Sequence, residues 1–372
     1  MSLPTFSIII PCYNQGHFLK DCLNSIQEQK IKDWEVWVVN DGSEDNTAQV
    51  AHEFLERNSK IHYLYQTNQG LSAARNAGMN QAQGHFLIFL DADDWLETDL
   101  FSKYIELISS NPDFQLFRCG YAYWDHPDGY CFHTHNPSGK GEIFPEVLTQ
   151  NIGPCHSILI QREFAQKLGG FDVKLKSCED WDFWIRAGRA GAKFFSINEV
   201  LVAYRYVSHS MSRNPRIMYE SLSEVSRRVG QTDDRLPESS PFKEPYTLNY
   251  SSIQKKHLLP FLGLLIQQEK LPEAISWYLE EKSIWNWEID IEDWNQMSSY
   301  LTWRYFLNKK DCQTVLKKIR PKLLDFFNGL GYSNKDSIRI SSLILSPQLK
   351  KWNHFRYGRI LGALVNRLMF ST

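Results

Sequence analysis

The fold is decided by the stretch His85-Phe-Leu-Ile-Phe-Leu90, which runs directly into Asp91-Ala-Asp93-Asp94-Trp95. Five of the six residues from 85 to 90 are apolar and Gly84 precedes them, which indicates a short β-strand buried on both faces. In open parallel sheets, ligands bind beyond the carboxyl ends of the strands, which is where this acidic turn falls. The stretch therefore predicts an α/β fold with a binding site at the end of the strand.

The acidic turn, residues 91–94, holds three carboxylates in four residues. In a dry site their mutual repulsion would force protons onto them, and a bound cation is the simplest way to keep them ionised. Mg²⁺ and Mn²⁺ prefer such oxygen ligands and often share them with the phosphates of a substrate. The alternative is a solvated turn whose Asp side chains cap the next helix. Asp-x-Asp alone does not decide between the two.

Three further strand–helix units precede this strand. Strands are expected at 6–11, 34–39 and 61–66, and helices at 17–30, from Ser43 to about 58, and at 71–83. Pro11 is expected to end the first strand. The alternation predicts right-handed βαβ units and a Rossmann-like, mostly parallel sheet flanked by helices over about residues 5–110. Tyr13, Asp41 and the acidic turn then meet at one edge of the sheet, which favours a site.

The pattern changes after residue 115. Strands are expected at 116–124, 129–134, 155–160, 193–197 and 200–206, and one helix should begin with Glu179, Asp180 and Asp182 in its first turn. Residues 231–246 are polar and contain three prolines, as expected of a linker. Helices are expected beyond it, at 251–269, 272–282, 290–308, 311–328 and 336–345. We therefore predict a domain at 1–230, with halves at about 5–110 and 111–212, and a smaller all-α region at 247–372.

Bulk composition excludes several classes of protein. The formal net charge of −2 over 372 residues gives no electrostatic case for binding nucleic acid. The seven cysteines include no C-x-x-C pair, which fits a reducing compartment better than a zinc site or a disulfide framework. The N-terminus does not resemble a secretion signal. We expect a cytoplasmic protein, with peripheral contact at the inner face of the membrane as the alternative.

The stretch from Pro347 to Thr372 has five basic residues and no acid. Its apolar residues 360, 361, 364, 365, 368 and 369 fall on one helical face. Such a helix can lie on a membrane surface. The sequence alone favours the alternative, a terminal helix docked on the bundle with a basic outer face.

Six motifs, in this order, resemble those of the family 2 inverting glycosyltransferases of the GT-A fold. They are Ser7-Ile-Ile-Ile-Pro-Cys-Tyr-Asn14, Val39-Asn-Asp-Gly-Ser43, Gly70-Leu-Ser-Ala-Ala-Arg-Asn-Ala-Gly78, Phe89-Leu-Asp-Ala-Asp-Asp94, Gly169-Gly-Phe-Asp172 and Cys178-Glu-Asp-Trp-Asp182. Each is common alone, but the ordered set is a specific signal. The resemblance covers residues 5 to about 212 and leaves the C-terminal third without a family.

The resemblance implies a divalent cation, Mn²⁺ or Mg²⁺, and a hexosyl transfer from a UDP- or GDP-linked sugar to a hydroxyl. The acceptor would be a glycan, a lipid-linked molecule or a protein, in cell-surface polysaccharide or glycoconjugate synthesis. Carried over by position, Asp180 would be the general base with Glu179 beside it. The donor would be bound by Pro11, Tyr13, Asp41, Arg75 and Asp91, and the metal by Asp93, Asp91 and His209.

The chemistry of these residues agrees with the implied reaction. Charge develops on the departing diphosphate and needs a metal or positioned donors, while a carboxylate must take the proton of the acceptor. A base on the side opposite the leaving group predicts inversion, by the logic of inverting glycosidases. Asp182 is an alternative base, and Trp95, Trp181 and Trp184 could line the acceptor site or fill the core.

Two other functions stay open on the sequence. One is a non-catalytic nucleotide-sugar-binding protein that kept the pocket without turnover. The other is a phosphatase with an aspartyl nucleophile, which also uses a strand followed by Asp-x-Asp. Trp95 stands where such a phosphatase would have Thr or Val, and three strand–helix units come first, so the sequence disfavours it.

Overall fold

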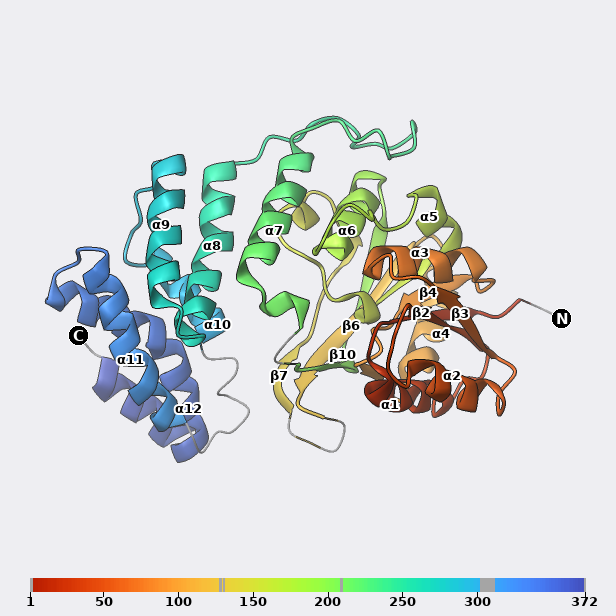
Figure 1. Cartoon of the computed structure of the whole chain (residues 1–372), viewed down its shortest axis with the longest axis horizontal. Coiled ribbons are helices and arrows are strands. Elements are labelled where there is room, and N and C mark those ends of the chain that lie inside the picture. The colour runs from red at the N-terminus through yellow and green to blue at the C-terminus, as the bar shows by residue number, and fades with distance from the viewer. Residues whose placement is uncertain (1–2, 127–128, 130, 208–209, 302–311, 371–372) are drawn as a thin grey trace. The chain divides into compact units, whose positions relative to one another are not determined.

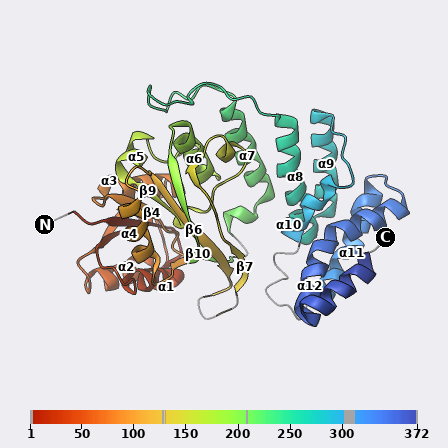
Figure 2. The same cartoon turned by 180° about the vertical axis from the view of Figure 1, so that it is seen from behind.

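We describe the protein from a computed structural model, in which residues 3–126, 129, 131–207, 210–301 and 312–370 are described (Figures 1 and 2). The chain forms two compact units. The first comprises Met1–Ser208 and Glu224–Thr247, and the second comprises His209–Ser223 and Leu248–Thr372. The first unit contains the sheet and the second is helical, and each is described by itself.

The first unit is built on one mixed sheet. Among the described residues its strands lie in the order β3-β2-β1-β4-β9-β6-β10-β5, with β7 paired to β6 and β8 to β10. The first four strands in this order are parallel to one another. The strands are β1 (Phe6–Cys12), β2 (Trp34–Asp41), β3 (Ile61–Gln66), β4 (Phe86–Phe89), β5 (Trp95–Leu96), β6 (Leu116–Trp124), β7 (Cys131–His135), β8 (Lys140–Glu142), β9 (Ile158–Gln161) and β10 (Lys193–Arg205).

Helices cover both faces of this sheet. Helices α1 (Gly16–Gln27), α2 (Thr47–Leu55) and α4 (Leu100–Ser110) share one apolar core with β1, β2 and β4. Helix α3 (Leu71–Gln81) packs on the other face, where a Cβ at Gly78 would lie 2.5 Å from Ile9 Cγ2. Helices α5 (Arg162–Lys167) and α6 (Glu179–Arg189) follow in the second half of the sheet (Figure 1). This architecture confirms the predicted GT-A-like α/β class.

Several expected boundaries were wrong. Pro11 does not end the first strand but lies within it, opposite Val39, and β1 continues to Cys12. Helix α2 begins at Thr47 instead of Ser43, and the Asp45 carboxylate accepts hydrogen bonds from the backbone N–H (2.9 Å) and the hydroxyl (2.5 Å) of Thr47. A local hydrogen bond between a side chain and the backbone, which spacing does not reveal, accompanies this helix start.

The second half of the sheet also differs from the expectation. The two strands expected at 193–197 and 200–206 are one strand, β10, whose pairing with β6 shifts register between Ser196 and Val202. That irregularity explains why the pattern looked like two strands. The segment Cys155–Ser157 is a 3₁₀ turn, and only Ile158–Gln161 forms β9, which runs antiparallel to β4.

Residues 231–247 are irregular and belong to the first unit. The buried side chain of Arg189 holds them through main-chain carbonyls. It donates to the carbonyl oxygens of Phe242 (2.8 Å), Glu244 (2.8 Å) and Gln231 (3.1 Å), and also to that of Lys243. The segment expected to be a linker is therefore fastened to the sheet unit.

The second unit is a bundle of helices around Trp277, Trp294, Phe326 and Phe327. Its helices are the first part of α7 (Pro215–Val229), then α8 (Tyr250–Gln267), α9 (Leu271–Trp285), α10 (Ser298–Leu301), α11 (Cys312–Gly329) and α12 (Asn334–Phe370). The helix expected at 290–308 is a 3₁₀ turn followed by the short α10, and its remainder lies outside the described residues. None of the helices described here has the length and hydropathy needed to span a lipid bilayer.

Candidate functional site

The acidic turn lies at the carboxyl end of β4, in the middle of the parallel part of the sheet. The backbone N–H of Leu90 donates to the carbonyl of Ile9 (2.9 Å), so β4 stays paired with β1 up to the turn. The N–H of Asp94 then donates to the carbonyl of Asp91 (3.0 Å) and closes the turn. The neighbouring strands β1 and β2 end at the same edge, where Cys12 is paired with Asn40. The loops that were predicted to carry the site therefore adjoin at one edge of the sheet.

Arg75 joins the acidic turn to the start of α6. Its Nη2 donates to Asp91 Oδ1 at 2.7 Å and its Nη1 donates to Glu179 Oε1 at 2.6 Å. The guanidinium is buried, and its Nε has no hydrogen-bond partner within the described residues. Glu179 is buried as well, and Asp180 follows it. One buried cation thus holds together two acidic segments that are far apart in the sequence.

Asp41 positions the helix that carries Arg75. Its carboxylate accepts hydrogen bonds from the Gln66 side chain (2.6 Å) and from the backbone N–H groups of Gln69 (2.9 Å) and Gly70 (2.8 Å). Gly70 has φ +90° and is the residue before α3. Asp41 therefore fixes the loop that starts α3, in addition to the nucleotide-binding role that the resemblance implies.

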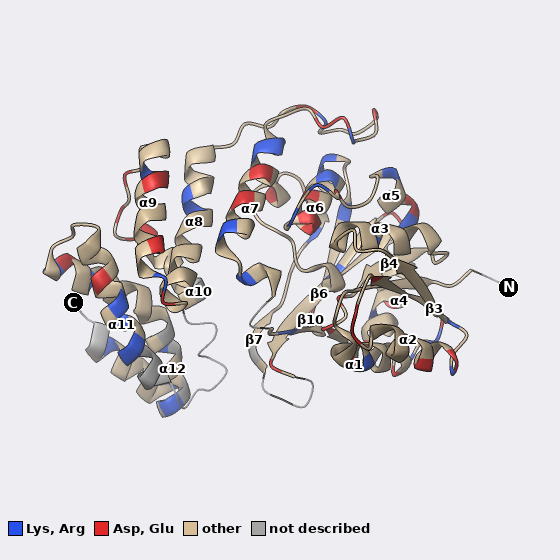
Figure 3. Ribbon diagram, in the orientation of Figure 1, with Lys and Arg blue, Asp and Glu red and all other residues tan. Residues whose placement is uncertain are grey.

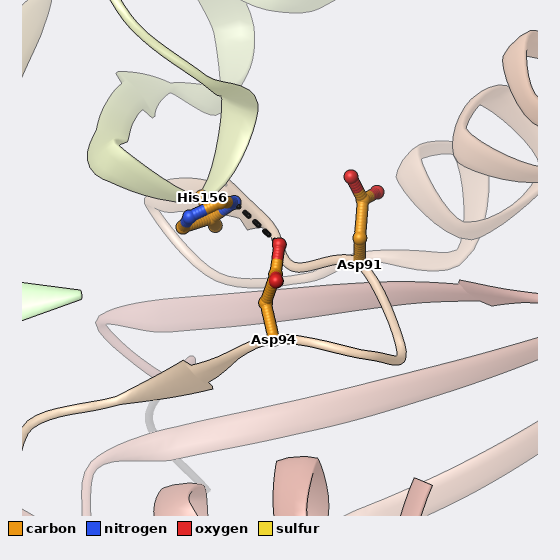
Figure 4. A group of neighbouring side chains, drawn as sticks. All are labelled: Asp91, Asp94 and His156. Atoms are coloured by element: carbon orange, nitrogen blue, oxygen red, sulfur yellow. Dashed lines mark ion pairs between the residues drawn. The ribbon is translucent and has the colours of Figure 1, made fainter. Parts of the chain in front are cut away.

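Asp94, the last acid of the turn, lies against the buried side chain of His156. Asp91, Asp94 and His156 each present one potential ligand atom within 4.8 Å of the others (Figure 4). Nδ1 of His156 lies 3.1 Å from Asp94 Oδ2, but neither ring nitrogen makes a hydrogen bond of good geometry within the described residues. Burial lowers the pKa of His156 to about 4, so its imidazole is neutral near pH 7. The 3.1 Å approach is therefore not a pairing of opposite charges.

Arg205, at the end of β10, also binds the acidic turn through hydrogen bonds. Its Nε donates to the carbonyl of Asp93 (2.7 Å), and its backbone N–H donates to Asp94 Oδ1 (2.7 Å). Its Nη2 donates to Asp21 on α1 (2.8 Å), and its guanidinium lies over the Trp95 ring, 5.0 Å from the centroid. The charge of Arg205 is thus paired with Asp21, while its hydrogen bonds fix the backbone of the turn.

The turn carries more negative charge than its surroundings balance. Burial, and then repulsion from Asp91, raise the pKa of Asp93 to about 6, against a weaker opposing effect of Arg205 and Gln15. Burial, and then the charges of Asp93 and Asp91, raise the pKa of Asp94 well above its ordinary value. Carboxylate oxygens, together with an imidazole whose nitrogens lack good partners, form a donor set that a divalent cation fits.

The start of α6 carries the carboxylates of Asp180 and Asp182, and the sequence alone does not show which of them is the better candidate for a general base. Asp180 accepts hydrogen bonds from Asn151 Nδ2 (3.0 Å) and from the backbone N–H of Trp181 (2.7 Å). Burial, and then the neighbouring charge of Glu179, raise its pKa to about 6. No cation forms an ion pair with Asp180 in the part of the chain that is described.

Asp182 lies in a different environment, where three arginines surround it. It pairs with Arg186 (3.0 Å), Arg228 (3.1 Å) and Arg235 (3.0 Å). Burial works to raise its pKa, but the charges of Arg186 and Arg235 outweigh that effect and hold the pKa below its ordinary value. A carboxylate held ionised by three cations is a weak proton acceptor.

The remaining predicted residues are placed as follows. Pro11 is buried in β1, and Tyr13 follows this strand with its side chain 50% exposed. His209, the third expected metal ligand, lies outside the described residues. Trp181 and Trp184 are fully buried and Trp95 is nearly so. These three tryptophans fill the core and do not form an open acceptor wall.

Asp94 was expected only as one of three acids in the turn, and no role was expected of His156 or Arg205. Asp94 could have been found, since it is the third acid of the turn. His156 is a lone histidine in the turn before β9 and Arg205 is the last residue of β10, so neither belongs to a recognisable motif. They reach the turn only because β9 and β10 lie in the same sheet as β4.

Comparison with known proteins agrees with this geometry. Residues 7–169 match the family model described as Glycosyl transferase family 2. The chain is 44% identical over 238 residues to the glycosyltransferase GlyA of Streptococcus pneumoniae, a match spanning 60% of this chain and 34% of GlyA. It is 27% identical over 223 residues to the uncharacterized glycosyltransferase EpsJ of Bacillus subtilis, across 57% of this chain and 64% of EpsJ. These matches support a family 2 glycosyltransferase domain in the N-terminal part of the chain.

Two more similarities bear on role and fold. The putative teichuronic acid biosynthesis glycosyltransferase TuaG of Bacillus subtilis is 26% identical over 216 residues, which cover 57% of this chain and 82% of TuaG. Among solved structures, the mannosyltransferase PcManGT of Pyrobaculum calidifontis, in complex with GDP-Man and Mn²⁺, superposes with a TM-score of 0.51 at 17% identity. That match covers 82% of this chain and 86% of PcManGT, and it shows a shared fold.

Proposed function

We propose that the protein is a metal-dependent, inverting glycosyltransferase that moves a sugar from a nucleoside-diphosphate donor to a hydroxyl acceptor. The observation that carries the proposal is the buried bridge from Asp91 through Arg75 to Glu179. Through this bridge the acidic turn, which suits a cation and a diphosphate, lies close to Asp180, which suits a base. Charge stabilisation and proton removal are the two requirements of the transfer.

Asp180 is the proposed general base. A base works best when its pKa is close to the working pH, and burial beside Glu179 raises the pKa of Asp180 to about 6. Asn151 donates to Asp180 Oδ2 and the Trp181 N–H donates to Oδ1, so the carboxylate is held in one orientation. Since Asp180 would act on the side opposite the leaving diphosphate, the proposed outcome at the anomeric carbon is inversion.

The cation would be held by Asp91 and Asp93, with Asp94 and His156 beneath them. When bound, it would neutralise the charge that develops on the leaving diphosphate. Arg75 fixes the orientation of Asp91, and Arg205 fixes the backbone of Asp93. Both arginines are positioning residues in this proposal, since they act through other groups.

The donor is proposed to be a UDP- or GDP-linked sugar. PcManGT, which shares the fold, was solved with GDP-Man and Mn²⁺, and TuaG is described as acting in teichuronic acid biosynthesis. By analogy we propose Mn²⁺ or Mg²⁺ as the cofactor and a glycan, a lipid-linked saccharide or a protein as the acceptor, in polysaccharide or glycoconjugate synthesis.

Thermal shift with UDP and with GDP, each with and without Mn²⁺, tests the proposed donor site. A ligand of the folded state raises the melting temperature, and one nucleotide is expected to do so only with Mn²⁺. Asp93→Asn should abolish the Mn²⁺-dependent shift, whereas Asp234→Asn, in the irregular segment of the first unit, should keep it. An equal shift with and without Mn²⁺ in the parent protein would contradict metal-dependent donor binding.

Product analysis then tests transfer and stereochemistry. The nucleotide that binds defines a panel of its sugar conjugates, and release of that nucleotide is followed with Mn²⁺ present. Proton NMR of the glycosidic product reports the anomeric configuration, which should be opposite to that of the donor. Retention of configuration would exclude the inverting mechanism, and binding without turnover across the panel and a range of acceptors would favour the non-catalytic binding protein.

A further inference from the structure

The last helix turns back on itself at Gly358. This residue has φ 76° and ψ 173°, which are not helical, so the stretch after it is a separate helical segment, residues 359–370. The segment packs against the preceding turns through a buried amide pair, in which Asn353 Nδ2 donates to Asn366 Oδ1 at 2.8 Å. Asn366 Nδ2 donates in turn to the carbonyl of Lys350 (3.2 Å). The inward face of the segment is therefore polar.

Gly362 makes this close approach possible. A Cβ at this position would lie 2.6 Å from His354 Cα and 2.7 Å from the carbonyl oxygen of Asn353. Gly362 and Asn366 are four residues apart and both are buried, so they mark the face that points inward. A helix that docks on a protein core would bury its large aliphatic side chains there, whereas Ile360, Leu361, Leu364 and Leu368 of this segment are exposed.

The outward face carries those aliphatic side chains. Ile360, Leu361, Leu364 and Leu368 are exposed by 89, 54, 54 and 76%, and at 3.6 residues per turn they lie on one face. The expectation that the apolar side chains dock on the bundle was therefore wrong, whereas the basic residues Arg359 and Arg367 are exposed as expected. A contiguous exposed apolar face of this kind marks an interaction surface.

The charges around this face decide between its possible partners. Residues 347–370, which belong to α12, contain five cations and no acid (Lys and Arg are blue in Figure 3). The cations are Lys350, Lys351, Arg356, Arg359 and Arg367. Two copies of such a surface would repel each other, because neither offers an acid to the other. An anionic partner with an apolar interior fits both properties, and a membrane rich in acidic phospholipids has them.

Aromatic residues at the fold-back support the same partner. Arg356 Cζ lies 4.9 Å from the ring centroid of Trp352 and 5.4 Å from that of Tyr357. A cation grouped with Trp and Tyr is a combination suited to the headgroup layer of a membrane. The aliphatic face lies in the turns that follow.

We propose that residues 350–370, the C-terminal hairpin, dock on the surface of an anionic lipid bilayer. Ile360, Leu361, Leu364 and Leu368 enter the boundary between headgroups and acyl chains, and the basic side chains lie at the level of the lipid phosphates. The segment lies on the membrane and does not cross it. This inference stands on the second unit alone and does not depend on the proposed transfer reaction.

Co-sedimentation of the full chain with vesicles tests the proposal. Binding is expected to phosphatidylglycerol–phosphatidylcholine vesicles and to weaken at least ~10-fold with pure phosphatidylcholine or with 0.5 M salt, as surface electrostatics predicts. Leu361→Ser, Leu364→Ser and Leu368→Ser together should reduce binding by ~10-fold or more, since they remove most of the apolar face. Arg359→Gln with Arg367→Gln should weaken binding only to the anionic vesicles.

The matched control is Leu279→Ser with Ile284→Ser on α9, which are also exposed, at 48 and 65%, and lie in the same unit. This variant should bind like the parent, and equal melting temperatures show that every variant folds. The proposal is overturned if the parent protein does not bind anionic vesicles, or if the triple Leu→Ser variant binds as well as the parent. It is also overturned if the parent is a dimer without vesicles and that variant a monomer, because a second copy would then cover the face.

Discussion

The acidic turn after β4 and the pair Asp172–Asp182 beside α6 both gather buried or half-buried carboxylates, but they differ in how the charge is balanced. Asp182 pairs with Arg186, Arg228 and Arg235, and the last two also contact Asp172. In the turn, Arg75 pairs with Asp91, and no ion pair with a cation is found for Asp93 in the described chain.

The difference separates a cluster whose charge is balanced from one whose charge is not, and only the second suits the proposed chemistry. Opposite charges keep Asp182 ionised and lower its pKa, so that it contributes to the fold. Burial without enough positive charge raises the pKa values of Asp93 and Asp180 to about 6. A site that must receive a cation and a proton cannot already be satisfied by the protein, so unbalanced charge is what a functional site requires.

The largest effect on the rate of transfer is expected from a substitution of Asp180. Asp180→Asn keeps the size of the side chain but removes the proton acceptor, so the rate of transfer should fall by ~10²–10⁴-fold. Nucleotide binding measured by thermal shift should stay near that of the parent. Near-normal transfer by this variant would show that Asp180 is not the base.

A substitution of Asp182 is expected to lower stability and to leave the rate of transfer nearly unchanged. Asp182→Asn leaves three arginines around a neutral group, which should lower the free energy of unfolding by ~3 kcal/mol, since breaking a buried ion pair is costly. Denaturant unfolding measures this loss, and kcat of the remaining folded protein should change little. A variant that keeps its stability but loses transfer would reverse the roles given to Asp180 and Asp182.

The pH profile sharpens the comparison further. Asp180 can accept a proton only when ionised, and its pKa is raised to about 6. The value of kcat/KM should therefore rise with pH up to about 6 and fall ~10-fold for each unit below it. The measurement is made with saturating Mn²⁺ so that the turn stays ionised, and a profile that is flat between pH 5 and pH 7 would refute the assignment.

The smallest effect is expected at Asp94. Asp94→Asn keeps an oxygen for the Arg205 N–H and removes one charge from a crowded turn, so without divalent cations the free energy of unfolding should stay equal or rise by up to ~1 kcal/mol. Chemical denaturation in EDTA gives the value. If Asp94→Asn lowered the free energy of unfolding as much as Asp182→Asn is expected to, the negative charge of the two clusters would be equally well balanced by cations.

The first half of the sheet, and the edge at which the candidate site lies, could be predicted from the sequence. Strand–helix alternation and the buried run before Asp91 follow directly from side-chain periodicity, so β1 to β4 and their common edge could be predicted. Asp91 and Glu179 were both named from their motifs. Their link through Arg75 could not be seen, because a salt bridge across 104 positions has no periodic signature.

The errors have a common physical origin. The start of α2 coincides with local hydrogen bonds of the Asp45 side chain. The bounds of β9 and the continuity of β10 depend on pairing between strands that are distant in the sequence. His156 became part of the site through the same long-range pairing. The ranking of Asp180 over Asp182 required the positions of Arg228 and Arg235, which lie about fifty residues further along the chain.

The hydrogen bonds from Arg189 to residues 231–247 have a practical consequence for isolating the sheet unit. A chain cut at residue 230 would lose the carbonyl oxygens that Arg189 binds, and it would also lose Arg235, a counter-charge of Asp182. A buried guanidinium and a buried carboxylate would be left partly unsatisfied. A shortened protein that ends after Thr247 retains both sets of contacts, and it also keeps residues 209–223, which belong to the second unit.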